Sequence, residues 1–116
     1  MEIRRETTSH QVAIAGRVSD QNQMPLHRVK VELIEMPEDL KAKRSLLQRL
    51  YKTDWETSAK RFDQTYTAID GWFYFIDLPT GHYTIQLSSS EGSNAQNPVP
   101  VVVNREVGAT WINLSY

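Results

Sequence analysis

The stretch Tyr66–Leu87 reads Tyr-Thr-Ala-Ile-Asp-Gly-Trp-Phe-Tyr-Phe-Ile-Asp-Leu-Pro-Thr-Gly-His-Tyr-Thr-Ile-Gln-Leu, and it decides the fold. Its Asp70-Gly71 pair separates two β-prone runs and predicts a two-residue type I′ hairpin turn, in which both residues have positive φ. Phe73 and Phe75 alternate along the second run, so we expect them to share the buried face of a strand. Leu-Pro-Thr-Gly at 78–81 then ends that run, because proline cannot donate to a ladder and glycine permits a tight reversal.

Alternating apolar residues predict further strands on both sides of this stretch. Pro98 and Pro100 place the sixth run at a sheet edge. Proline has no N–H to donate, and only an edge strand has a side on which no ladder hydrogen bond is needed. Seven short strands separated by turns predict an antiparallel sandwich in one domain, 10–116, preceded by a flexible arm, 1–9. The predicted strands are 11–19, 28–36, 61–69, 72–78, 82–89, 99–103 and 109–116.

Residues 37–60 interrupt the strand pattern with a predicted helix over about 38–52. Its first turn is acidic and its last turn is basic, which suits the helix dipole. A loop, 53–60, is expected to follow. An isolated helix of this length is marginal in water, so its apolar stripe must pack on its own sandwich or in the groove of a partner. The stripe consists of Leu40, Leu47, Leu50 and Tyr51.

Composition excludes several classes of function for these 116 residues. The 13 basic and 14 acidic side chains give a net charge of −1, so there is no field to hold nucleic acid or an anionic membrane. Cysteine is absent, which excludes disulfides, thiolate catalysis and Cys-ligated metal sites and fits a reducing compartment. No apolar run approaches the ~20 residues that span a bilayer. With no secretory signal at the start of the sequence, we expect a cytoplasmic protein.

Three segments carry a family resemblance: Ile14–Asp20, Met24–Leu33 and Thr67–Ile85. In this order they resemble the G-x-V-x-D, P-L-x-x-V-x-V-x-L and T-x-x-D-G-x-F-x-F-x-x-L-P-x-G-x-Y elements of the carboxypeptidase regulatory-like domains. The resemblance covers 12–37 and 64–116, and it implies an all-β, seven-stranded antiparallel transthyretin-like (prealbumin-like) β-sandwich. Residues 38–60 depart from the family, whose members usually join these strands with a few residues.

The sequence offers no catalytic or metal-binding constellation. His10, His27 and His82 do not have the spacing of metal ligands, and no nucleophile–histidine–acid pattern or phosphate loop stands out. The isopeptide bond of bacterial adhesin repeats needs a lysine on the first strand, where this chain has Arg17. We therefore expect no enzyme activity, no cofactor, no metal and no internal cross-link.

The resemblance implies a module that stabilises, connects or binds. We therefore expect a non-catalytic structural or adaptor module that docks on other protein subunits of a larger intracellular assembly. The kind of family suggests a phage-tail-like contractile particle, with no particular residue behind that suggestion. The insertion, 37–60, is expected to form most of the docking surface through its apolar stripe and basic face.

The outward face of the fourth predicted strand leaves three alternatives open. If Phe73 and Phe75 face the core, their neighbours point outward, where the insertion, a partner or a sugar covers them. The sugar alternative is a carbohydrate-binding module that uses Trp72, Tyr74 and Trp55. The expected partner-binding residues are Leu40, Lys43, Arg44, Leu47, Arg49, Tyr51, Trp55, Trp72 and Tyr74.

Overall fold

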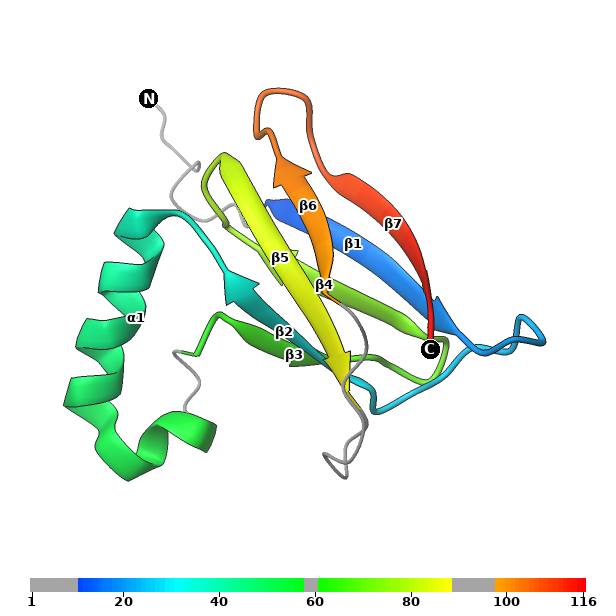
Figure 1. Cartoon of the computed structure of the whole chain (residues 1–116), viewed down its shortest axis with the longest axis horizontal. Coiled ribbons are helices and arrows are strands. Elements are labelled where there is room, and N and C mark those ends of the chain that lie inside the picture. Colours follow the sequence, from blue (N-terminus) through cyan, green and yellow to red (C-terminus); the bar gives the residue numbers. More distant parts are fainter. Residues whose placement is uncertain (1–10, 58–60, 89–97) are drawn as a thin grey trace, which may run out of the picture.

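In the computed structural model the described residues are 11–57, 61–88 and 98–116, and they form two packed β-sheets with one α-helix at their side (Figure 1). The predicted sandwich of seven strands with an inserted helix is confirmed. The predicted arm, 1–9, lies outside the described residues. The elements are β1 (Val12–Ser19), β2 (Lys30–Glu35), α1 (Glu38–Tyr51), the 3₁₀ helix η2 (Lys52–Thr57), β3 (Gln64–Tyr66), β4 (Trp72–Ile76), β5 (Gly81–Ser88), β6 (Val99–Val103) and β7 (Thr110–Ser115).

The three-stranded sheet has the order β4-β1-β7, and the four-stranded sheet has the order β3-β2-β5-β6. The central strand β1 is antiparallel to β4 but parallel to β7, with Ile14 opposite Thr110. Every pair in the four-stranded sheet is antiparallel. The prediction of antiparallel pairing therefore holds for all pairs except β1–β7. The strand β6, which contains Pro100, is an edge strand, as its prolines predict.

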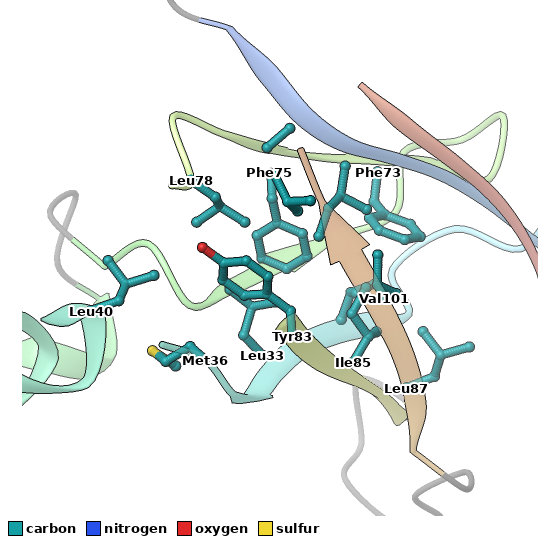
Figure 2. Close-up of a cluster of buried hydrophobic side chains, with 14 of the residues drawn as sticks. Leu33, Met36, Leu40, Phe73, Phe75, Leu78, Tyr83, Ile85, Leu87 and Val101 are labelled. Carbon is teal, nitrogen blue, oxygen red and sulfur yellow. The ribbon is translucent and has the colours of Figure 1, made fainter. Parts of the chain in front are cut away.

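The core fills the space between the two sheets, and β4 and β5 contribute its large aromatic side chains. Phe73 and Phe75 are buried with their rings edge to face at 6.0 Å, which confirms the face assigned to them. Figure 2 shows Phe75 above Tyr83, which reaches in from β5. Leu78 and Leu33 close the same layer on the side of α1 (Figure 2). Buried aromatic and branched side chains of this kind supply most of the hydrophobic driving force.

The turn at Asp70-Gly71 differs from the prediction, because it joins the two sheets instead of closing a hairpin. The strand β3 pairs with β2, whereas β4 pairs with β1. Only Gly71 has positive φ (83°) in this turn, and its N–H donates to Ala68 O at 2.9 Å. Ala68 N–H in turn donates to Trp72 O at 2.9 Å. The loop therefore has three residues, 69–71, in the form of a type I turn followed by a left-handed glycine.

The segment predicted as strand 61–69 forms a strand only over Gln64–Tyr66. Just before this strand, Asp63 forms ion pairs with two arginines. Just after it, Thr67 forms hydrogen bonds with the loop that precedes β2. The Thr67 hydroxyl accepts from Val29 N–H at 3.0 Å and donates to Leu26 O at 2.7 Å. These contacts satisfy the backbone of the loop before β2, so Thr67 fixes where that strand begins.

A prediction concerns Gly16 of β1, whose backbone lies directly against the Phe73 ring. A Cβ added at Gly16 would lie 2.3 Å from Phe73 Cζ, so no side chain fits beneath that ring. We expect Gly16→Ala to lower the free energy of unfolding by about 1–3 kcal/mol. In a double-mutant cycle measured by denaturant unfolding, Phe73→Leu should recover part of this loss, with a coupling of at least about 0.5 kcal/mol. Strictly additive effects would mean that the clash is relieved elsewhere.

A second prediction concerns alkaline pH. Burial raises the pKa of the Tyr83 hydroxyl from 10.0 to about 12, because desolvation disfavours the phenolate. The folded chain therefore binds this proton more tightly than the unfolded chain, and the resulting stability is lost as the pH rises from 10.0 to about 12. Tyr83→Phe should flatten this fall in unfolding free energy, although it also removes the 2.6 Å hydrogen bond to Pro79 O. Equal pH profiles for the two proteins would contradict the assignment.

Candidate interaction surface

The helix α1 stands beside the sandwich and is anchored to it near its first turn (Figure 1). Leu40 is its one buried residue among those described, and Figure 2 shows it at the edge of the core beside Met36. Of the remaining predicted stripe, Leu47 and Tyr51 are half-buried, and Leu50 is 67% exposed. The stripe therefore packs on its own sandwich at one end only.

A buried carboxylate ties the insertion to the sandwich. Asp63 is 2% exposed, and its Oδ1 accepts from Arg61 Nε at 2.8 Å. Its Oδ2 lies 3.4 Å from Arg44 Nη1 on α1. Arg61 Nη2 also lies 3.5 Å from Glu32 Oε2 on β2. The network thus connects the helix, the segment before β3 and the four-stranded sheet, and a buried charge of this kind requires its partners.

Trp55 lies inside the insertion. Its side chain is 4% exposed, and the Arg61 guanidinium lies 5.6 Å from the centre of its ring. Among the described residues, its Nε1–H finds no hydrogen-bond partner. A ring this deeply buried is not exposed for stacking on a sugar.

The basic side chains of α1 have different environments. Arg44 is engaged with Asp63, and Lys41 lies 3.5 Å from Glu38 on the same helix. Lys43 is exposed with its Nζ 5.3 Å from the centre of the Phe62 ring, and Arg49 is exposed. Of the predicted basic contacts, Lys43 and Arg49 therefore present their charge to solvent, while Arg44 has an internal structural contact.

The outer face of the three-stranded sheet carries an aromatic cluster that α1 does not cover. Trp72 and Tyr74 lie 6.4 Å apart with their rings 11° from parallel. Trp111, which is 66% exposed, meets Trp72 edge to face at 5.8 Å. Beneath them, the buried Ala15 on β1 is paired with both Tyr74 and Trp111. Trp111 was missing from the predicted set, although its alternation with Ile112 already indicates an outward position.

A groove of about 320 Å³ separates α1 from β4. This volume is at the lower end of the range of about 300–1,000 Å³ that is usual for binding clefts. The groove brings together the two surfaces that the sequence predicts separately, the helical insertion and the outward side chains of β4. Its walls include Leu40 and Lys43 of α1, Phe62 and Gln64 on the β3 side, and Tyr74 and Ile76 of β4.

No family model matches this chain, and no curated protein matches it either. Solved structures do match. The fold is similar to one part of a pilin subunit. The chain is similar to BcpA, the major pilin subunit of Bacillus cereus, with a TM-score of 0.55 and 11% sequence identity over 90% of this chain. A variant of the same pilin gives a TM-score of 0.56, also at 11% identity. The match spans 29% of the pilin, so the likeness concerns the fold of one part of that subunit.

The described residues contain no group of three or more histidine, aspartate or glutamate side chains placed to hold a metal ion. Across 11–57, 61–88 and 98–116, no helix is long and apolar enough to cross a membrane. Phe73 and Phe75 are buried in the core between the two sheets. What the described surface offers is apolar side chains around a groove.

We predict that Asp63→Asn lowers the free energy of unfolding by about 2–4 kcal/mol, because both arginines lose their buried counter-charge. Amide hydrogen exchange should also become faster along α1, since Arg44 no longer holds the helix. Lys41→Met is the matched control, because it removes an exposed ion pair and should change stability by less than about 0.5 kcal/mol. If denaturant unfolding shows an equally small loss of unfolding free energy for both variants, the network does not anchor the insertion.

Proposed function

We propose that this chain is a non-catalytic structural or adaptor module that docks on other protein subunits of a larger assembly. The observation that carries the proposal is the apolar surface left uncovered on α1 and on β4. Leu46 and Leu50 are 50% and 67% exposed on α1, and Tyr74 and Ile76 are about half exposed on β4. Clustered exposed apolar side chains are typical of interaction sites.

The similarity to a pilin subunit supports assembly with other protein chains in general terms. We further propose membership in the carboxypeptidase regulatory-like domains, for which the support is sequence: Ile14–Asp20 falls on β1, and Thr67–Ile85 spans the β3–β4 turn, β4 and most of β5. A cytoplasmic setting stays a prediction from the absence of cysteine. A phage-tail-like contractile particle stays a suggestion from the kind of family.

The proposed docking surface on α1 is one face of the helix. Lys43, Leu46 and Leu50 lie three and four residues apart, so they face the same way around α1. Ser45 and Gln48 are exposed on the opposite side of the helix. These two positions provide a control with the same added charge and the same helix.

We predict that Leu46→Glu/Leu50→Glu reduces co-purification of the partner subunits at least about tenfold, because burial of two leucines is lost. The control, Ser45→Glu/Gln48→Glu, should co-purify like the wild type. The measurement is quantitative mass spectrometry after affinity purification from a native lysate, repeated with the identified partner in purified form. Thermal unfolding must first show that both double variants are folded.

Charge reversal extends this experiment without disturbing the fold. Lys43→Glu/Arg49→Glu should weaken docking more at low salt than at high salt, because exposed charges are screened. Arg44 is left unchanged, because its reversal would place a like charge beside the buried Asp63. Equal co-purification by the leucine variant, the control and the wild type would exclude α1 as the docking surface.

The second candidate is a carbohydrate-binding module, and the exposed cluster of Trp72, Tyr74 and Trp111 favours it. The buried Trp55 has no place in that site, so Trp111 takes its role. Titration with oligosaccharides, followed by tryptophan fluorescence, distinguishes this candidate from protein docking. A response that Trp111→Ala removes and Leu46→Glu/Leu50→Glu retains would favour sugar binding.

A further inference from the structure

The strand β4 has a free edge that faces the groove. In the part of the chain that the structure describes, β4 forms a ladder with β1 alone. The next strand along the chain, β5, belongs to the other sheet, and β3 also pairs there. One long side of β4 is therefore left without a strand partner among the described residues.

The direction of the backbone groups on β4 follows from its two ends. Gly71 O accepts from Val18 N–H at 2.8 Å, and Asp77 N–H donates to Gln11 O at 2.8 Å. Backbone groups alternate along an antiparallel strand, so the odd-numbered residues of 71–77 point toward β1 and the even-numbered residues point away. Trp72 follows this rule, since its N–H and O bond outward to Asp70 and Ala68.

The peptide groups of Tyr74 and Ile76 therefore point into the free edge. Each offers one N–H and one C=O with the spacing of a β-ladder. Their side chains stand on the same side of the groove and are about half exposed. Two donors and two acceptors in this arrangement form a template for one more strand.

The two edges of the four-stranded sheet are protected, whereas the β4 edge is not. The strand β6 contains Pro100, and β3 has three residues. The fourth edge strand, β7, also has no charge and no proline, and at its start the Thr110 hydroxyl donates to Val102 O on β6 at 2.8 Å. The strand β4, which reads Trp-Phe-Tyr-Phe-Ile, contains no charge and no proline, although natural edge strands usually carry one of them.

We infer that the groove binds an extended segment of another polypeptide, which adds to the three-stranded sheet as a strand beside β4. This inference rests on the proposed function and names the mode of docking. The segment is apolar where it meets Leu40, Phe62 and Ile76, which line the groove.

Charge defines the segment further. Lys43 lies at the groove with its ammonium over the Phe62 ring, and the described residues provide it with no ion-pair partner. An acidic residue in the bound segment would supply the missing counter-charge. The occupant is therefore an extended apolar segment with one aspartate or glutamate next to Lys43.

The test uses the full chain and a displayed library of random nine-residue peptides, from which the best binder is synthesised. Amide hydrogen exchange by NMR is then measured with and without this peptide. Tyr74 and Ile76 amides should exchange rapidly in the free protein and become at least about tenfold slower when the peptide is bound, whereas Phe73 and Phe75 are protected in both states. Docking through side chains alone would leave Tyr74 and Ile76 unprotected and would overturn the inference.

A matched pair of variants tests the backbone contact. Ile76→Pro removes an N–H that points away from β1, so the fold is retained and peptide affinity should fall about tenfold. Ile76→Val keeps the N–H and should bind nearly as well as the wild type. A second pair is made in the peptide: N-methylation on the edge facing β4 should abolish binding, while N-methylation on the opposite edge should not. If the two methylated peptides bind equally, there is no added strand.

The Lys43→Glu variant should bind the selected peptide roughly two- to fivefold more weakly than the wild type does. Replacing the acidic residue of the peptide by lysine should restore its affinity for this variant. Protection of Tyr74 and Ile76 in the free chain would overturn the inference in favour of another occupant. If this protection increases with protein concentration, the occupant is a second copy of the chain. If the protection does not depend on concentration, the occupant is another segment of the same chain. Docking of a native partner that depends on Leu46 and Leu50 but leaves both amides unprotected would reject the added strand and retain the proposed function.

Discussion

The packing of Phe73 and Phe75 between the two sheets determines how β4 presents every other group. A pleated strand sends alternate side chains to opposite faces, so seating these two rings in the core turns Trp72, Tyr74 and Ile76 outward. The same alternation directs the backbone groups of the inward residues to β1 and those of the outward residues to the groove. The core packing of β4 and the side chains and backbone groups that it exposes are thus consequences of one register.

The insertion is held by different contacts, because α1 belongs to neither of the two sheets. Leu40 reaches the edge of the core, and the carboxylate of Asp63 joins Arg44 on the helix to Arg61 before β3. Burying a carboxylate costs free energy that its ion pairs only offset. The main effect of the Asp63 network is therefore to fix the position of α1. That position holds the groove open between the helix and β4.

Local patterns in the sequence predict what depends on near neighbours. Alternation places Phe73 and Phe75 inside, and helix-forming residues after Pro37 give α1 nearly its observed bounds. The Asp-Gly pair marks a turn correctly, but it does not reveal that the strands on its two sides join different sheets. That choice, like the parallel β1–β7 pair, is made by contacts between residues far apart in the chain.

The candidate surface shows the same division. Trp72 and Tyr74 follow from strand alternation, whereas the grouping of Trp111 with them requires β7 to lie beside β1. Similarly, a basic helix face reads as one solvent-exposed surface in the sequence. Arg44 leaves that surface because Asp63, 19 residues away in the chain, comes within reach only in the folded structure.

The one-sided attachment of α1 also affects how the protein unfolds. Much of the helix surface beyond its first turns is in contact with water, and the described part of the chain offers no acceptor to the buried indole N–H of Trp55. A region with few buried apolar contacts opens at a lower free energy than the sandwich core. We therefore expect α1 and η2 to open locally at a lower free energy than the two sheets. Such an opening would bring the buried Trp55 into contact with water before the chain denatures.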